Sequence, residues 1–379
     1  MSYVLFGSAV VDLVVGASLL FLATPLPYGE GSKPAIRLLR VLVAILGTTL
    51  VFALKLPILR LSGVDFFGMI HLVYVDLVVV LPLLGVLVLV AGFRGPGRLG
   101  ARRLTTSVWL LAAVSLSLAT VGFYSSFVEP FRLQVEQATV TLRSGRAGFA
   151  RLKVGVLADI QTDRVTDYER RAFSRLMELE PDLILVPGDL FQGSHEAFER
   201  ELPALHDLMK RLSAPGGVFF VLGNTDGNLE QLQRVFEDTA VRLLVNEIVS
   251  VDIKDRRVTI GGVPWDSEYG PTVDELQRAP GDDAIRILLA HYPDVLFDVS
   301  AGSRIDLVVA GHTHGGQVQL PVIGPPITLS RVPRAIAAGG LHETDGRQIY
   351  VSRGLGCERD QAPRIRFLCP PEVSLLTLE

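Results

Sequence analysis

The chain has 379 residues, of which 49% are hydrophobic, and its formal net charge at pH 7 is only −4. Its mean hydropathy of +0.39 is too high for an ordinary soluble globular protein. The near balance of charge excludes the basic field that sequence-independent nucleic-acid binding requires, so nucleic acid is not an expected partner. Two cysteines are too few for a disulfide framework, and we interpret Cys357 and Cys369 as packing residues.

The excess of apolar residues lies almost entirely before residue 130. Four stretches of about 20 residues match the length that a helix needs to cross a bilayer. They cover residues 4–23, 39–59, 69–92 and 105–127. We therefore predict that residues 1–130 form an all-α transmembrane anchor of about four helices, followed by a linker with a leading strand at 131–149 and a C-terminal domain at 150–379.

The positions of Lys and Arg predict the orientation of this anchor. Basic residues gather after the first and third predicted spans, namely Lys33, Arg37 and Arg40, and Arg94, Arg98, Arg102 and Arg103. Short loops rich in Lys and Arg stay in the cytoplasm, which places residues 150–379 on the other side. The pattern thus predicts a multi-pass protein of the cell membrane with an extracytoplasmic C-terminal domain and the lipid bilayer as a partner.

From about residue 150 the pattern becomes that of a layered α/β domain. Short apolar runs without regular alternation are typical of strands covered on both faces. They occur at 152–158, 183–187, 218–222, 285–290 and 305–310. Amphipathic stretches at 166–180, 194–212 and 229–237 predict the covering helices. In such folds the carboxyl ends of neighbouring strands meet at one edge, where ligands bind.

A polar cluster follows each of these five runs. The residues are Asp159 and Gln161, then Asp189, then Asn224, Thr225 and Asp226, then His291, and finally His312 and His314. A single one of them would be an ordinary turn, cap or surface residue. Five clusters at the ends of five buried strands indicate one shared site instead.

The residue types at this predicted site indicate divalent metal ions. Oxygen and imidazole ligands without a thiolate suit Mn, Fe, Zn or Mg. Two carboxylates, one amide oxygen and three imidazoles are enough for two adjacent ions if one carboxylate bridges them. Two such ions favour displacement at phosphorus, so the pattern predicts hydrolysis of a phosphoester.

Several motifs in this half of the chain resemble those of the calcineurin-like metallophosphoesterase family. They are LADIQ (157–161), PGDLFQG (187–193), LGNTDG (222–227), AHYPD (290–294) and AGHTHGGQV (310–318). YVSRGLG at 350–356 and the closing FLCPPEVSLLTL resemble the membrane-associated branch of that family, which has N-terminal transmembrane helices. The resemblance covers residues 150–379 and implies a double β-sheet sandwich flanked by helices.

By motif position, the resemblance also implies a role for each site residue. Asp159, Gln161 and His314 would bind the first metal ion, Asp189 would bridge the two ions, and Asn224, His291 and His312 would bind the second. Asn224, Thr225 and Asp226 occupy the motif that acts on the leaving group. The implied activity is hydrolysis of a phosphoric ester or a diphosphate.

Three positions depart from the family pattern, and the least important is Gln192, which stands where a second Asp often follows the G-D pair. Gln161 stands where the family has the His of a D-x-H motif, and an amide oxygen is a weaker ligand than imidazole. Thr225 replaces the His of G-N-H-[DE], and a Thr hydroxyl is a poor proton donor to a leaving group. A diphosphate tolerates this loss because its phosphate leaving group needs no proton. The alternative is therefore a pyrophosphohydrolase of the type that acts on UDP-2,3-diacylglucosamine, facing the cytoplasm.

Two further alternatives stay open. Gln161 and Thr225 would also suit a degenerate, non-catalytic domain that binds a ligand without turnover. Asp12 and Asp76, within predicted spans, would suit a transporter regulated by the C-terminal domain. Retention of the six other ligand positions favours the enzyme. We expect a phosphorylated substrate, and at a membrane this substrate could be linked to a lipid.

Overall fold

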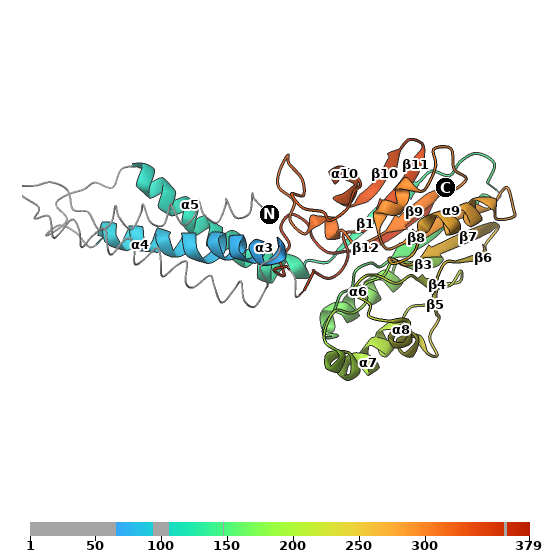
Figure 1. The fold of residues 1–379 in the computed structure, drawn as a ribbon, viewed down its shortest axis with the longest axis horizontal. Coiled ribbons are helices and arrows are strands. Elements are labelled where there is room, and N and C mark those ends of the chain that lie inside the picture. The colour runs from blue at the N-terminus through green and yellow to red at the C-terminus, as the bar shows by residue number, and fades with distance from the viewer. Residues whose placement is uncertain (1–65, 94–105, 147, 360–361) are drawn as a thin grey trace, which may run out of the picture. The chain divides into compact units, whose positions relative to one another are not determined.

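The computed structural model describes residues 66–93, 106–146, 148–359 and 362–379 (Figure 1). The predicted spans 4–23 and 39–59, Asp12 and the two basic loops lie outside these residues. The chain divides into two compact units, of which the second comprises Phe127–Cys357 and Ile365–Glu379. Residues before Phe127 belong to the first unit.

Helices make up the described part of the chain before the sheets. They are α3 (Phe66–Val75), the π-helix η1 (Asp76–Val80), α4 (Leu81–Phe93), α5 (Thr106–Phe123), the π-helix η2 (Tyr124–Val128) and the 3₁₀ turn η3 (Glu129–Phe131). Two segments, Ile70–Leu87 and Ala112–Phe131, are long and apolar enough to cross a membrane. They overlap the predicted spans 69–92 and 105–127. Two such helices are weak evidence for a membrane domain, because buried core helices and signal sequences pass the same test, so a bundle of four spans is not supported.

Two mixed six-stranded sheets form the second unit. The first has the order β1 (Gln134–Val140), β12 (Glu372–Leu378), β2 (Leu152–Val156), β3 (Leu183–Val186), β4 (Val218–Phe220) and β5 (Val241–Leu243). The second has the order β10 (Gly340–Thr344), β11 (Arg347–Val351), β9 (Leu307–Ala310), β8 (Ile285–Ala290), β7 (Arg256–Val263) and β6 (Glu247–Ile253). Strands β2 to β5 are parallel, as are β7, β8, β9 and β11, so their carboxyl ends share an edge.

Alternation along the central strands divides the apolar side chains between the two faces of each sheet. On β3, Leu183 and Leu185 enter the core between the sheets, whereas Ile184 and Val186 pack toward the helices on the outer face. These helices are α6 (Asp167–Met177), α7 (His195–Met209) and α8 (Leu229–Phe236). The outer face of the second sheet packs against α9 (Tyr269–Arg278), the 3₁₀ helix η4 (Pro293–Phe297) and α10 (Arg334–Ala337). The predicted double sheet flanked by helices is confirmed.

Side-chain caps begin the three predicted helices. Thr166 caps α6 in a capping box with Glu169, Ser194 caps α7, and Asn228 caps α8.

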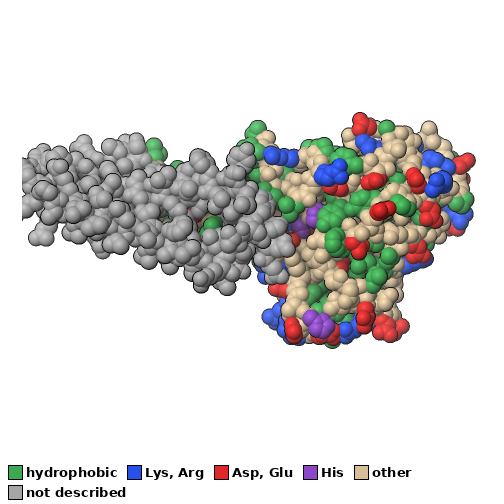
Figure 2. Space-filling model, in the orientation of Figure 1, with side chains coloured by type: hydrophobic (Ala, Val, Ile, Leu, Met, Phe, Trp, Pro, Cys, Tyr) green, Lys and Arg blue, Asp and Glu red, His purple; other side chains and the backbone are tan. Residues whose placement is uncertain are grey.

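Acidic and basic side chains are interspersed over the visible face of this unit (Figure 2). Both cysteines are buried and unpaired, as the interpretation of packing residues required.

Candidate metal centre

Backbone hydrogen bonds bring together the loops that follow β2, β3, β8 and β9. The Asp159 amide donates to the Gly188 carbonyl at 3.1 Å, the Gln161 amide to the Asp189 carbonyl at 2.8 Å, and the Gly311 amide to the His291 carbonyl at 3.0 Å. Several of these residues adopt left-handed backbone conformations, with φ of 45° at Asp159, 36° at Gln161, 59° at Asp189, 70° at His312 and 49° at His314. Such conformations in non-glycine residues gather at functional sites, where the surrounding structure imposes them.

Asp159, Asp189 and His314 form the first group, which we call the carboxylate cluster. One potential ligand atom of each lies within 4.8 Å of the others, and all three residues are buried. Burial and the neighbouring Asp189 raise the pKa of Asp159 well above its usual value. Burial also lowers the pKa of His314 well below its usual value, and neither ring nitrogen makes a hydrogen bond of normal geometry within the described residues. A neutral imidazole with a free lone pair beside two buried carboxylates fits a divalent cation.

Asn224, His291 and His312 form the second group, the imidazole cluster. Nδ1 of His291 lies 2.7 Å from the Pro187 carbonyl, which can only accept, so Nδ1 carries the hydrogen. Burial lowers the pKa of His291 to about 4, which leaves a lone pair on Nε2. That atom faces Oδ1 of Asn224 at 2.9 Å and Oδ2 of Asp189 at 3.5 Å. A lone pair facing two oxygens without a hydrogen between them is an arrangement that a cation stabilises.

Asp189 belongs to the carboxylate cluster and also faces the imidazole cluster. Its Oδ2 faces His291 and accepts a hydrogen bond from Nε2 of Gln161 at 3.1 Å, while Oδ1 accepts from the Thr225 amide at 2.9 Å. Oδ1 of Asn224 completes the second side, 3.0 Å from Nδ1 of His312. The structure therefore brings together all seven residues that the sequence predicts as ligands. Gln161, however, contacts Asp189 through its amide nitrogen, so its role as a ligand stays a prediction.

One side chain of the predicted catalytic motif, that of Asp226, makes structural contacts. The carboxylate of Asp226 accepts from the amides of Asp189 at 2.9 Å, Leu190 at 2.5 Å and Gly223 at 2.7 Å. It therefore holds the loop of Asp189 in place. Oγ1 of Thr225 is buried and has no hydrogen-bond partner in the described part of the chain. Catalytic roles for Asn224, Thr225 and Asp226 stay predictions, and the contacts of Asp226 are those of a positioning residue.

Glycines let the backbone approach Asp159 closely. A Cβ at Gly311 would lie 2.9 Å from both carboxylate oxygens of Asp159. At Gly354, which has φ of 72°, a Cβ would lie 2.7 Å from that of Asp159. The loops after β9 and β11 thus close over this carboxylate at a distance that only glycine permits.

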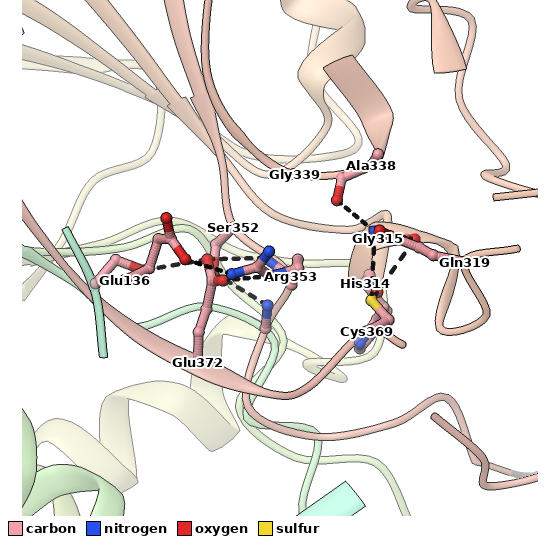
Figure 3. A network of polar contacts seen from close by, with 12 residues as sticks. Glu136, His314, Gly315, Gln319, Ala338, Gly339, Ser352, Arg353, Cys369 and Glu372 are labelled. Carbon is pink, nitrogen blue, oxygen red and sulfur yellow. Dashed lines mark hydrogen bonds and ion pairs between the residues drawn. The ribbon is translucent and has the colours of Figure 1, made fainter. Parts of the chain in front are cut away.

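Arg353 forms a network that the sequence did not predict (Figure 3). Its guanidinium pairs with Glu372 at 2.5 Å and with Glu136 at 2.6 Å, and the Tyr350 hydroxyl donates to Glu372 at 2.7 Å. Glu136 and Glu372 lie on β1 and β12, whereas Arg353 follows β11. The network therefore joins the edge of the first sheet to a loop of the second. The motif YVSRGLG contained the only sequence indication that this loop matters.

Arg366 is a fully buried arginine beside the site, and it binds backbone carbonyls. Its side chain donates to Gly356 at 3.1 and 2.5 Å, to Arg353 at 2.7 Å, to Gly354 at 3.1 Å and to Cys369 at 3.1 Å. The loop that it holds donates in turn from Gly356 to the Asp159 carbonyl at 2.7 Å. Arg366 thus holds the loop that supports the backbone of Asp159, and it makes no hydrogen bond to the carboxylate cluster itself.

Aromatic side chains border the imidazole cluster. The Tyr292 ring centroid lies 4.0 Å from that of His312 and 5.2 Å from that of His291, and the exposed Trp265 ring follows at 6.4 Å from Tyr292. The Tyr292 ring thus packs against both imidazoles and restricts their rotation.

Comparison with known proteins defines the class. The family described as calcineurin-like phosphoesterase matches residues 152–316. A metallophosphoesterase of Aquifex aeolicus is 30% identical over 270 residues, which cover 68% of this chain and 96% of that protein. The metallophosphoesterase YkuE of Bacillus subtilis is 28% identical over 284 residues (71% and 93%), and the phosphodiesterase YaeI of Escherichia coli is 27% identical over 281 residues (71% and 97%).

The chain belongs to the calcineurin-like phosphoesterase family. Together with the two clusters of potential metal ligands, this makes it a metal-dependent phosphohydrolase.

Replacing Arg366 by Lys tests its positioning role. An ammonium group cannot reproduce the fork of hydrogen bonds, so buried carbonyls lose their partners at a cost of about 1–3 kcal/mol. We expect a lower melting temperature and a roughly 10- to 100-fold weaker affinity for Mn²⁺, because Asp159 loses its support. Both are measurable by calorimetry.

Arg286→Lys is the matched control. Arg286 is equally buried and donates to four backbone carbonyls, of Leu276, Ala279, Gly281 and Ala284, but it does not contact the loops of the site. Its replacement should lower the melting temperature and leave Mn²⁺ affinity unchanged. Equal loss of affinity in the two variants would mean that Arg366 acts only through general stability.

Proposed function

We propose that this chain is a membrane-anchored, two-metal hydrolase of phosphoric esters or diphosphates. The observation that supports it is the position of Asp189 between a cluster with Asp159 and His314 and a cluster with Asn224, His291 and His312. Asp159 and His314 would hold one divalent ion, the imidazole cluster would hold the other, and Asp189 would be shared. Bound there, the ions supply Lewis acidity for displacement at phosphorus.

The protein's own contribution is to hold these ligands in the required protonation state. The Pro187 carbonyl keeps the hydrogen of His291 on Nδ1, so that Nε2 faces the site. Asp226 holds the amides of Asp189, Leu190 and Gly223, and so fixes the direction of the shared carboxylate. The low pKa of each histidine keeps all three imidazoles neutral at physiological pH.

The state of Thr225 bears on the substrate class. Its hydroxyl is buried, and an alcohol is too weak an acid to protonate a leaving group efficiently. A substrate whose leaving group needs no proton, such as a diphosphate or an activated diester, suits this arrangement. The relative YaeI is named a phosphodiesterase, which favours a diester. A diphosphate linked to a lipid, as in the UDP-2,3-diacylglucosamine type, is the second candidate substrate and would require a cytoplasmic site.

The membrane anchor is supported by the two apolar helical segments Ile70–Leu87 and Ala112–Phe131. An anchored enzyme would meet amphiphilic substrates in the plane of the bilayer, and the predicted extracytoplasmic orientation follows from the basic loops alone. A domain that binds a ligand without turnover is the competing function, favoured by the contact of Gln161 with Asp189 through nitrogen.

Replacing Asp189 by Asn tests the shared ligand. The amide keeps the size of the side chain but removes the negative charge that both ions would share. We expect loss of at least one equivalent of bound Mn²⁺ and a fall of about 100-fold or more in hydrolysis of bis-p-nitrophenyl phosphate. Metal analysis of the purified protein and steady-state kinetics measure the two effects.

Asp252→Asn serves as the control, because its carboxylate lies on β6 with 78% of its side chain exposed. It should retain both metal content and turnover. Unchanged turnover in the Asp189 variant would exclude the two-metal proposal, whereas bound metal with no turnover in the unmodified protein would support the binding function.

The stabilisation by Mn²⁺ should depend on pH. Without metal, burial and Asp189 raise the pKa of Asp226 to about 7 and that of Asp159 well above its usual value. Between the usual and the raised pKa values the folded state holds protons that the unfolded chain has released. The free energy of unfolding that these two groups contribute therefore falls as pH rises from about 4 to about 7. His291 acts in the opposite sense, because its contribution to the free energy of unfolding falls as pH falls from about 6.5 to about 4.

Because Mn²⁺ competes with protons for the carboxylates but not for the neutral imidazoles, it should stabilise more at higher pH. We expect the rise in melting temperature on adding Mn²⁺ to be larger at about pH 7.5 than at about pH 5.5. Thermal unfolding with and without chelator measures it. An equal or smaller rise at the higher pH would contradict the assignment of the Asp159 carboxylate to the metal site.

Replacing Thr225 by His tests the leaving-group proposal. An imidazole at this position could donate a proton, so kcat/KM should increase about tenfold for esters with poor leaving groups and little for p-nitrophenyl esters. Thr225→Val, which removes the hydroxyl without adding an acid, should leave the ratio between the two substrates unchanged. Equal effects of the His substitution on both substrates, at full metal content, would refute the proposal.

A further inference from the structure

The long loop between β9 and α10 contains an exposed apolar segment. This segment, Leu320–Leu329, we call the apolar tip. Val322 is 108% exposed, Ile323 62% and Leu329 54%, and no charged residue occurs from 318 to 330. Exposed apolar side chains are common singly, but this density within one loop indicates an interaction surface.

The tip has a defined shape. The amides and carbonyls of Leu320 and Gly324 bond to each other at 3.0 and 2.8 Å, which closes a tight turn. At its apex Val322 has φ of 69°, a left-handed conformation that is unfavourable for a β-branched residue. Glycine or asparagine would adopt it more readily. Because Val322 is fully exposed, no contact within the described chain accounts for an apolar, β-branched residue there.

The base of the loop is joined to the end of an apolar helical segment. Gln319 donates from its amide to the Phe367 carbonyl at 2.8 Å, and the exposed Leu368 follows. The next amide, of Cys369, donates to the Glu129 carboxylate at 2.8 Å. Glu129 lies in the last turn of the candidate span Ala112–Phe131. If that span crosses the bilayer, its end lies at the interface, and so does the base of the loop.

The same loop starts at the candidate metal centre. Cys369 Sγ donates to the His314 carbonyl at 3.3 Å, and the Gln319 side chain donates to Gly315 at 3.2 Å and to Ala338 at 2.7 Å (Figure 3). From His314 to Leu320 the chain advances six residues, at most about 20 Å. The tip and the site are therefore parts of one continuous element.

We propose that the apolar tip inserts into the interface of a bilayer with anionic headgroups and holds the metal centre against the membrane surface. Charge supports this partner: residues 318–341 contain Arg331 and Arg334, both exposed, and no acidic residue. Arginines beside an inserted apolar segment attract anionic lipids. The inference rests on the proposed membrane-anchored hydrolase, and it adds a second membrane contact that brings the site to a lipid substrate.

Fluorescence of the full chain in lipid nanodiscs tests the insertion. Val322→Cys carries an environment-sensitive nitrobenzoxadiazole label, and Val245→Cys, an exposed position between β5 and β6, is the matched control. Both native cysteines are buried, so labelling is directed to the introduced thiol. We expect the label at 322 to emit at shorter wavelength and to be quenched by nitroxide-bearing lipids, and the label at 245 to do neither.

Equal, weak quenching at 322 and 245 would overturn the proposal. A blue shift at 322 without quenching by the lipid probe would also overturn it, because protein rather than lipid would then cover the tip. With phosphatidylglycerol in the nanodisc, quenching at 322 should exceed that in phosphatidylcholine alone, and Arg331→Gln with Arg334→Gln should remove this difference. These readouts do not need turnover, so they separate failure of insertion from failure of the proposed function.

Kinetics provide the second arm. Val322→Asp with Ile323→Asp should lower hydrolysis of a bilayer-embedded phosphodiester about tenfold or more, since two apolar side chains no longer enter the interface. Hydrolysis of soluble bis-p-nitrophenyl phosphate should stay unchanged. Equal loss on both substrates would show that the tip acts on the site rather than on the membrane.

Discussion

Two buried carboxylates, Asp159 and Asp189, lie beside each other with a neutral imidazole, and this proximity of like charges constrains the whole site. Each charge raises the cost of ionising the other, which is why the pKa of Asp159 is raised. Proteins retain such groups when a proton or a cation neutralises them. The left-handed backbone at both residues and the close approach of Gly311 and Gly354 follow from the same requirement, since they hold the carboxylates together against repulsion.

The two sheets contribute different chemistry. The first carries the proposed oxygen ligands, Asp159, Asp189 and Asn224, and the second carries the three imidazoles after β8 and β9. Neither set alone resembles a two-metal site. The centre therefore exists only when the sheets pack face to face, and the ion pairs of Arg353 with Glu136 and Glu372 reinforce that junction at its edge.

The loop after β9 links the candidate metal centre to the exposed apolar tip. Its first residues supply His312 and His314, its middle forms the exposed apolar tip, and its base is bonded to the segment that includes Phe367 and Cys369. Through Cys369 that segment also contacts Glu129, at the end of a candidate span. The proposed hydrolysis of amphiphilic phosphates would require a metal centre near the headgroups, and these hydrogen bonds are the observation that supports that proposal.

The sequence by itself determined the strands β2, β3, β4, β8 and β9 and the helices α6, α7 and α8, because each depends on a local pattern: an apolar run that ends in a polar cluster, or apolar residues at helical spacing. Tertiary structure decided the rest. Arg353 and Glu136 are 217 residues apart, and their pairing follows only from sheet order. Likewise, Asp226 is read from sequence as catalytic, yet three backbone amides converge on it in space. The sequence gives the chemical type of each side chain directly. Which charged side chains meet, and how much burial changes their pKa values, depends on tertiary packing.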